Sequence, residues 1–179
     1  INYRNTRQIL QTASMIAAEL LTPDDRDDDS IPLIQPLSCG RDGHAPLVIR
    51  LPTLRDEARK IAELLETAHQ EGRAWSDMAV ICRHHAVMDE CALALRSRRL
   101  PHEVRRRTGS FKPLADTIKV LTMHASKGLE FPLVALPGVG SMPEPGESEA
   151  DEARLFYVAA TRATQTLYIT LSGTGAYMQ

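Results

Sequence analysis

Two short, uninterrupted apolar runs limit the fold of this chain more than any other feature of its sequence. Met78–Cys82 and Leu133–Leu136 contain no polar residue, and each has the length of a strand rather than of a helix. A strand that is apolar on both sides is typical of a parallel sheet with both faces covered, whereas a half-exposed strand alternates apolar and polar residues. The two runs therefore predict a parallel sheet between two covering layers.

The covering layers are predicted to be amphipathic helices. Apolar residues recur at helical spacing over residues 5–21, 54–71, 86–99 and 150–163. Further strands are predicted at Leu47–Leu51, His102–Arg106, Thr117–Met123 and Thr166–Leu171. A short helical turn is predicted at Lys127–Glu130. Strands that alternate with helices favour a three-layer α/β fold, in which a parallel sheet has helices on both faces.

Composition and charge are those of an ordinary intracellular globular protein. The 179 residues suffice for one α/β domain with a sizeable core. The net charge of −2 provides no overall basic field for nucleic acid, which does not exclude a local basic patch. The three cysteines lack the C-x-x-C spacing of metal sites, so we expect reduced thiols and no metal ligands in this chain. The apolar runs are too short to span a membrane, and we expect no membrane contact.

The start of the chain indicates either a piece of a longer protein or the loss of the first residues. The first residue is Ile1 rather than methionine, and residues 1–21 are amphipathic, unlike a signal peptide. We expect residues 1–179 to form a single domain of a longer protein. The acidic run Asp24–Asp29 is expected to be a solvated loop.

The segment Thr122–Phe131 is the first candidate for chemistry. A predicted strand ends here, and the chain turns through small and polar residues. Because ligands of an open α/β sheet bind at the carboxyl ends of its strands, we expect the polar side chains of this segment at that edge. These side chains are His124, Ser126, Lys127 and Glu130. The alternative is that Lys127 and Glu130 belong to an exposed turn without a function.

Two further segments carry candidate residues. Arg162 follows a predicted helix and precedes a predicted strand, so it could bind either a nucleotide phosphate or the last carbonyls of its own helix. Near the start of the chain, Tyr3 could stack on a base while Arg4 reaches phosphate. The alternative for Tyr3 and Arg4 is an ordinary entry into the first helix.

In this order, the three segments closely resemble motifs IV, V and VI of the UvrD/Rep-type superfamily 1 helicases. Lys-Gly-Leu-Glu-Phe at 127–131 and Tyr-Val-Ala-Ala-Thr-Arg-Ala at 157–163 are highly specific, and Asn-Tyr-Arg at 2–4 is supportive. The resemblance extends over nearly the whole chain. It implies the C-terminal, second RecA-like domain of such a helicase, with the three-layer parallel sheet of P-loop NTPases.

The resemblance implies contacts with ATP. Arg4 and Arg162 would act as catalytic arginine fingers that reach the γ-phosphate. Tyr3 would stack on the adenine, and Glu130 would bond the ribose hydroxyls. ATP and Mg²⁺ would otherwise be bound mainly by the first RecA-like domain of the same parent chain, because this sequence has no G-x-x-x-x-G-K-[ST] loop and no Asp-Glu pair at a strand end.

The resemblance also implies contacts with single-stranded DNA. Thr122 and His124 would lie near the DNA, and Ser126 and Arg83 are further candidates. An alternative role for Ser126, shared with Lys127, is to couple the nucleotide and DNA sites. We expect the His124 region to lie at the same strand end as the nucleotide contacts, so that one rigid element couples nucleotide state to DNA position.

A cluster of arginines offers a second surface for phosphate. Its members are Arg96, Arg98, Arg99, Arg105, Arg106 and Arg107. Glu103 is the one acidic residue among them. The cluster is interpreted either as a stripe that contacts DNA or as a solvated helix end with an exposed strand.

These features favour the C-terminal motor domain of an ATP-dependent DNA helicase or translocase, an enzyme as the full-length protein and inactive as this chain alone. Only residues 100–116 span the place of the family's large helical insertion, so either the parent is a short form without it or the region was cut. The uninterrupted pattern of Arg105–Lys119 favours the short form, and with it translocation along a single strand. We expect a cytoplasmic, nucleoid-associated bacterial protein. The alternatives are a non-catalytic helicase-derived module that binds DNA or protein, and the helicase part of a helicase–nuclease.

Overall fold

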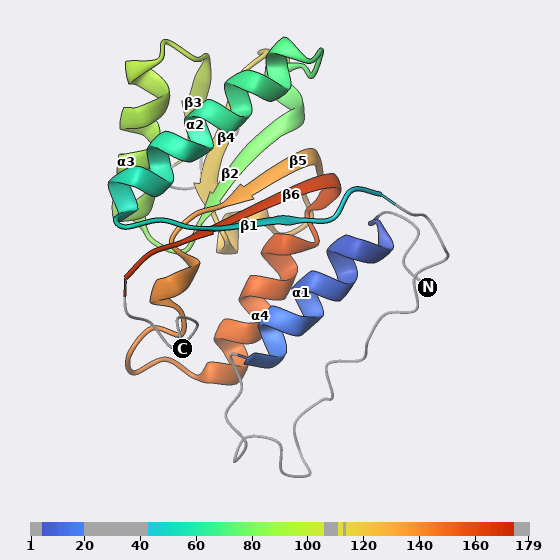
Figure 1. Cartoon of the computed structure of the whole chain (residues 1–179), viewed down its shortest axis with the longest axis vertical. Coiled ribbons are helices and arrows are strands. Elements are labelled where there is room, and N and C mark those ends of the chain that lie inside the picture. The colour runs from blue at the N-terminus through green and yellow to red at the C-terminus, as the bar shows by residue number, and fades with distance from the viewer. Residues whose placement is uncertain (1–4, 20–42, 106–110, 113, 174–179) are drawn as a thin grey trace.

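A parallel sheet is the centre of the molecule. The computed structural model describes residues 5–19, 43–105, 111–112 and 114–173. Six strands in this part of the chain pair in the order β1-β6-β5-β2-β4-β3, and every pair is parallel (Figure 1). The strands are β1 Leu47–Arg50, β2 Met78–Cys82, β3 His102–Val104, β4 Ile118–Thr122, β5 Phe131–Leu136 and β6 Ala163–Leu171.

Helices cover both faces of the sheet. The α-helices are α1 Arg7–Glu19, α2 Leu54–Gln70, α3 His85–Ser97 and α4 Glu149–Ala160, and the 3-10 helices are η2 Trp75–Asp77, η3 His124–Ser126 and η4 Val139–Ser141. Helices α1 and α4 pack together on one face, and α2 and α3 pack together on the other (Figure 1). The predicted three-layer architecture is therefore confirmed. Across the described residues, no helix combines the length and the apolar composition needed to cross a membrane.

The central strands divide the core into two halves. All five residues of β2 are buried, as the continuous apolar run predicted. Ala79 and Ile81 face the core under α1 and α4, whereas Met78, Val80 and Cys82 face the core under α2 and α3. This division follows from the two-residue period of a strand, which sends neighbouring side chains to opposite faces.

Two local predictions need correction. Lys127–Glu130 is not helical, because the helical turn lies earlier, at η3. The Thr122 hydroxyl accepts a hydrogen bond from the Ala125 N–H at 3.2 Å and so holds the start of this turn. Gly128 then adopts a left-handed φ of 83°, which ends any helical path and which suits glycine best. In addition, β6 begins at Ala163 rather than at Thr166, so only two residues separate it from α4.

The short connection between β3 and β4 is hydrogen-bonded to β3, the outermost strand on that side of the sheet. Glu103 on β3 accepts hydrogen bonds from the Thr117 hydroxyl at 2.6 Å and from the Lys119 ammonium at 2.9 Å. Its carboxylate also accepts a bond from the Lys112 N–H at 3.3 Å. The bonds from Thr117 and Lys119 lower the pKa of Glu103 from 4.5 to about 2. Glu103 therefore anchors both β4 and the connection to β3.

We predict that Glu103 stabilises the fold in a pH-dependent manner. Its pKa is lower in the folded state, so its contribution is fully present above about pH 4.5 and is lost as the pH falls toward 2. Urea unfolding of the wild type and of Glu103→Gln, measured over this range, should give free energies that converge on acidification. The control is Glu63→Gln, which removes only an exposed pair with Lys60 at 3.5 Å. A Glu103→Gln difference that stays constant down to pH 2 would contradict the assignment.

Candidate functional site

Arg162 lies in the tight connection between α4 and β6. Its Nε donates to the Val158 carbonyl at 2.9 Å, so the arginine does bind a carbonyl in the last turn of its own helix. Its Nη1 donates to the Leu129 carbonyl at 3.3 Å, in the loop that precedes β5. The side chain is half-buried, and Nη2 has no partner among the residues described. Two backbone carbonyls thus fix the guanidinium and leave one nitrogen available for an anion.

Asn5 joins the first motif segment to the same place. Its side-chain amide donates to the Thr161 carbonyl at 2.7 Å and to the Ala163 carbonyl at 2.6 Å, on either side of Arg162. Asn5 is 2% exposed, and its bonds bridge positions that are far apart in the sequence. Tyr3 and Arg4, which directly precede Asn5, lie outside the described residues.

Glu130 completes this edge of the sheet. It is exposed and immediately precedes Phe131, whose N–H donates to the Arg162 carbonyl at 2.9 Å. Phe131 and Ala163 are the first residues of their strands and pair in register. The structure therefore brings Asn5, Glu130 and Arg162 together at the amino end of β5 and β6.

The predicted DNA contacts lie at the opposite edge. Thr122 ends β4 and pairs in register with Cys82, the last residue of β2. His124 follows and is exposed. Ser126 is 0% exposed, and its hydroxyl donates to the Met123 carbonyl at 2.6 Å, so in this conformation it holds the loop and presents no surface.

The positions of Glu130 and Arg162 correct the expectation of one shared strand end. Because all strands are parallel, the end of β4 and the start of β5 are at opposite edges of the sheet. The loop 123–130 runs between these edges over the face covered by α1 and α4, where Ala125 and Leu129 pack against the core. His124 follows the carboxyl end of β4, as expected, whereas Glu130 precedes the amino end of β5.

Arg83 is held in a buried ion pair. Its Nη2 and Nε donate to Glu152 at 2.7 and 2.9 Å, and Nη2 also lies 3.4 Å from Glu144. Glu152 is 2% exposed, and the Arg83 side chain is 12% exposed. Hydrogen bonding to Glu152 raises the pKa of Arg83, against the opposing effect of burial. This ion pair joins the end of β2 to the first turn of α4, at the edge formed by the carboxyl ends of β2 and β4.

Glu57 is a buried group that the sequence analysis missed. It is 1% exposed on α2 and accepts hydrogen bonds from the Gly138 N–H at 2.9 Å and the Thr170 hydroxyl at 2.8 Å. The Ser172 hydroxyl also donates to its carboxylate. These bonds tie α2 to the carboxyl ends of β5 and β6. Its burial could have been predicted from its position one turn before Ile61, on the apolar face of the helix.

The predicted arginine cluster does not form one continuous stripe in the described residues. Arg96 and Arg99 are exposed at the end of α3, and Arg98 pairs with Glu66 at 2.7 Å. Arg105 is half-buried, at the end of β3. Arg106 and Arg107 lie outside the described residues.

Comparison with known protein families identifies the family of this chain. The model of the UvrD-like helicase C-terminal domain matches residues 1–113 and 106–174. The chain belongs to this family. A solved structure, the C-terminal domain of a possible DNA helicase from Lactobacillus plantarum WCFS1, superposes with a TM-score of 0.66 at 23% identity, covering 98% of this chain and 90% of that one. That likeness supports the RecA-like α/β fold.

Curated relatives match a smaller part of the domain. ATP-dependent DNA helicase PcrA of Bacillus subtilis (strain 168) is 48% identical over 63 residues, covering 31% of this chain and 8% of PcrA. ATP-dependent DNA helicase Rep of Escherichia coli (strain K12) is 44% identical over 62 residues, covering 31% and 9%. RecBCD enzyme subunit RecB of Chlamydia pneumoniae is 38% identical over 63 residues, covering 35% and 6%. The match spans less than a tenth of the length of each of these relatives.

We predict that the two carboxylates on Arg83 differ sharply in their effect on stability. Glu152→Ala should lower the free energy of unfolding by about 3 kcal/mol, because it leaves a mostly buried guanidinium without its main partner. Glu144→Ala is the matched control, since Glu144 is 41% exposed and contacts the same guanidinium at 3.4 Å, and it should cost less than about 1 kcal/mol. Urea unfolding measures both. An equal loss of unfolding free energy in the two variants would show that the buried pair with Glu152 stabilises the domain no more than the exposed one with Glu144.

Proposed function

We propose that this domain is the C-terminal motor domain of an ATP-dependent DNA helicase or translocase. In this proposal the amino edge of β5 and β6 completes a nucleotide site, and the carboxyl edge of β4 contacts single-stranded DNA. The observation that carries the proposal is the loop 123–130, which connects these two edges and is bonded to Arg162 through the Leu129 carbonyl. Family membership and the names of the curated relatives support ATP and DNA as ligands.

The nucleotide edge suits a phosphate and a ribose. Guanidinium groups bind phosphate oxygens through paired hydrogen bonds, and a pre-fixed guanidinium loses less entropy on binding. Arg162 has such a fixed position, and its Nη2 has no partner in the part of the chain that the structure describes. Glu130 is exposed at the same edge and would accept bonds from ribose hydroxyls. Tyr3 and Arg4 are proposed as the base-stacking residue and the second arginine finger.

The rest of the ATP site is proposed to come from the first RecA-like domain of the parent chain. The sequence has no phosphate-binding loop, and the described residues contain no group of three or more His, Cys, Asp or Glu side chains that could hold a metal ion. When bound between the domains, ATP would supply the γ-phosphoryl group whose charge Arg162 neutralises. Mg²⁺ would be held mainly by the first domain.

Coupling between the two edges is proposed to run through the loop 123–130. A shift of Arg162 toward a phosphate would pull on the Leu129 carbonyl. The buried Ser126 stiffens the loop by its bond to Met123, which in turn donates to the Cys82 carbonyl at 2.8 Å. Thr122 and His124 at the far end of the loop would then change their contact with DNA. Arg83 supports this edge through its pair with Glu152, rather than as a primary DNA contact.

We also propose that the domain lacks the large helical insertion of its relatives. The chain between β3 and β4 comprises residues 105–117, and Glu103 binds Lys112 and Thr117 within it. These bonds within a connection of this length support a short form without an inserted domain that grips duplex DNA. Translocation along a single strand is therefore the favoured activity.

We predict that Arg162→Ala in the full-length parent lowers DNA-stimulated ATP hydrolysis by roughly a thousandfold or more, because an arginine finger contributes that much to phosphoryl transfer. A steady-state ATPase assay with single-stranded DNA measures the loss, and circular dichroism checks the fold. The matched control is Arg154→Ala on α4, which removes an exposed pair with Asp151 and should leave turnover unchanged. Wild-type turnover in Arg162→Ala would overturn the finger assignment.

We predict that this 179-residue chain alone hydrolyses no ATP, because the loop that binds the phosphates is not part of its sequence. The purified chain with Mg²⁺, ATP and single-stranded DNA should release phosphate at the rate of the buffer blank. Magnesium-dependent release that is lost in Arg162→Ala would refute the proposed division of the site between two domains.

A further inference from the structure

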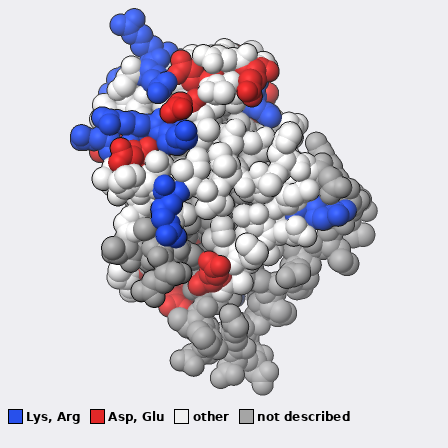
Figure 2. Space-filling view, viewed as in Figure 1, with Lys and Arg blue, Asp and Glu red and all other residues white. Residues whose placement is uncertain are grey.

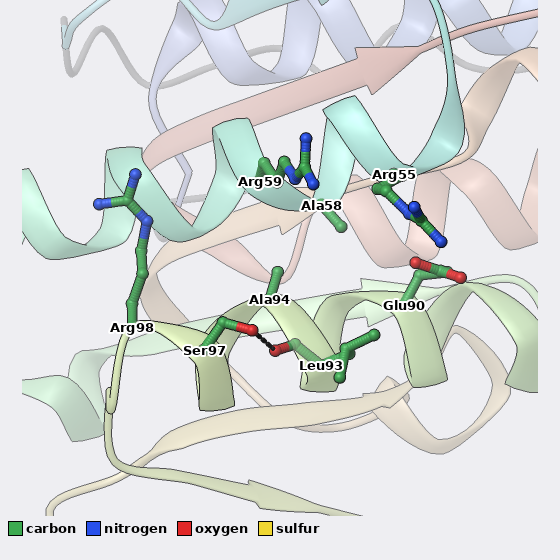
Figure 3. Close-up of a pocket in the computed structure, with 8 residues that line it drawn as sticks. All are labelled: Arg55, Ala58, Arg59, Glu90, Leu93, Ala94, Ser97 and Arg98. Atoms are coloured by element: carbon green, nitrogen blue, oxygen red, sulfur yellow. Dashed lines mark hydrogen bonds between the residues drawn. The ribbon is translucent and has the colours of Figure 1, made fainter.

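A groove between α2 and α3 lies apart from the motif segments. Its volume is about 530 Å³. Figure 3 shows Arg55 and Arg59 projecting from α2, with Glu90 and Leu93 on the facing side of α3. The two helices cover the sheet face opposite to the one crossed by the loop 123–130. The lining of the groove contains none of the residues proposed for nucleotide or DNA binding.

The floor of the groove is apolar because small residues face each other there. Ala58 on α2 is 2% exposed, and Ala94 on α3 is half-buried. Two alanines leave a hollow that longer side chains would fill. Leu93 is 50% exposed beside this hollow and adds an apolar side chain to its wall. The surface therefore offers space and apolar contact for one or more inserted side chains.

The rim of the groove is basic in a chain whose net charge is −2. Figure 2 shows lysine and arginine side chains gathered over the layer formed by α2 and α3, with acidic side chains between them. Arg55 and Arg59 have no ion-pair or side-chain hydrogen-bond partner within the described part of the chain. Arg98 lines the end of the groove but pairs with Glu66. With Arg98 paired, Arg55 and Arg59 against Glu90 still give the lining an excess of positive charge.

We propose that this groove binds an acidic, leucine-bearing amphipathic segment of a partner protein. Carboxylates of the segment would meet Arg55 and Arg59, and its apolar side chains would enter the hollow beside Leu93. Helices that bind in grooves are recognised in this way, through apolar anchors at helical spacing with charges along the rim. Nucleic acid is disfavoured, because single-strand grooves provide aromatic side chains for base stacking and this lining contains none.

The test uses the full chain and a defined probe. The probe is a fluorescein-labelled helical peptide of about 15 residues, with leucines at helical spacing and glutamates between them. Fluorescence anisotropy should show binding to the wild type. Binding should be at least tenfold weaker to Arg59→Glu and to Leu93→Ser. The first variant places a negative charge against the glutamates of the peptide, and the second removes an apolar contact with its leucines.

Matched controls separate this groove from general charge attraction. Lys60→Glu changes the net charge as much as Arg59→Glu does, but Lys60 lies outside the groove lining and pairs with Glu63, so peptide affinity should be unchanged. Peptides with glutamine for glutamate or serine for leucine should bind at least tenfold more weakly. No binding of the probe, or equal losses in the Arg59 and Lys60 variants, would overturn the proposal.

Two further outcomes would assign the groove to another occupant and also overturn the proposal. Binding of a thymidine oligonucleotide in place of the peptide, if it is lost only in Arg59→Glu, would identify a nucleic-acid surface. Concentration-dependent dimers in sedimentation, abolished by Arg59→Glu, would identify a second copy of this chain. None of these measurements involves ATP hydrolysis, so their failure is distinguishable from failure of the proposed motor function.

Discussion

The burial of β2 and β5 on both faces is the constraint on which the rest of the structure depends. Strands without a polar side must have a layer on each face, so helices cross from one strand to the next over both faces of a parallel sheet. In such a sheet every strand end at one edge is a carboxyl end. A loop that joins two strands consecutive in the sequence, such as β4 and β5, must then travel from one edge to the other. The path of the loop 123–130 is a direct consequence, and with it the separation of His124 from Glu130.

Arginines in this domain have three distinct environments, and the environment separates their roles. Arg83 is held by carboxylates and stabilises the junction of β2 with α4. Arg162 is held by backbone carbonyls, which fix its direction without neutralising its charge. Arg55 and Arg59 are exposed beside an apolar hollow and have no partner in the described residues. A charge that is fixed but not neutralised suits phosphate, and a charge left open on a groove rim suits an acidic partner.

Much of the fold and part of the site could be predicted from sequence. The apolar run of β2, the helical spacing of α2 and the order of elements all identified their structures, because each depends on side chains that are near in the sequence. The roles of Asn5, Glu57 and Arg83 could not be predicted in this way. Their partners lie 156, 81 and 69 positions away, and no local pattern specifies such contacts.

The sequence by itself determined the layers of the sheet, the motif segments and the family to which they belong. Only the tertiary structure decided which edge of the sheet each motif occupies, because that depends on the direction of every strand and on the register of β5 with β6. It also decided that Arg83 binds Glu152 and that Ala58 and Ala94 leave a hollow between two helices. Periodicity reports which face of an element is apolar, whereas the partner across that face is chosen by packing of the whole chain.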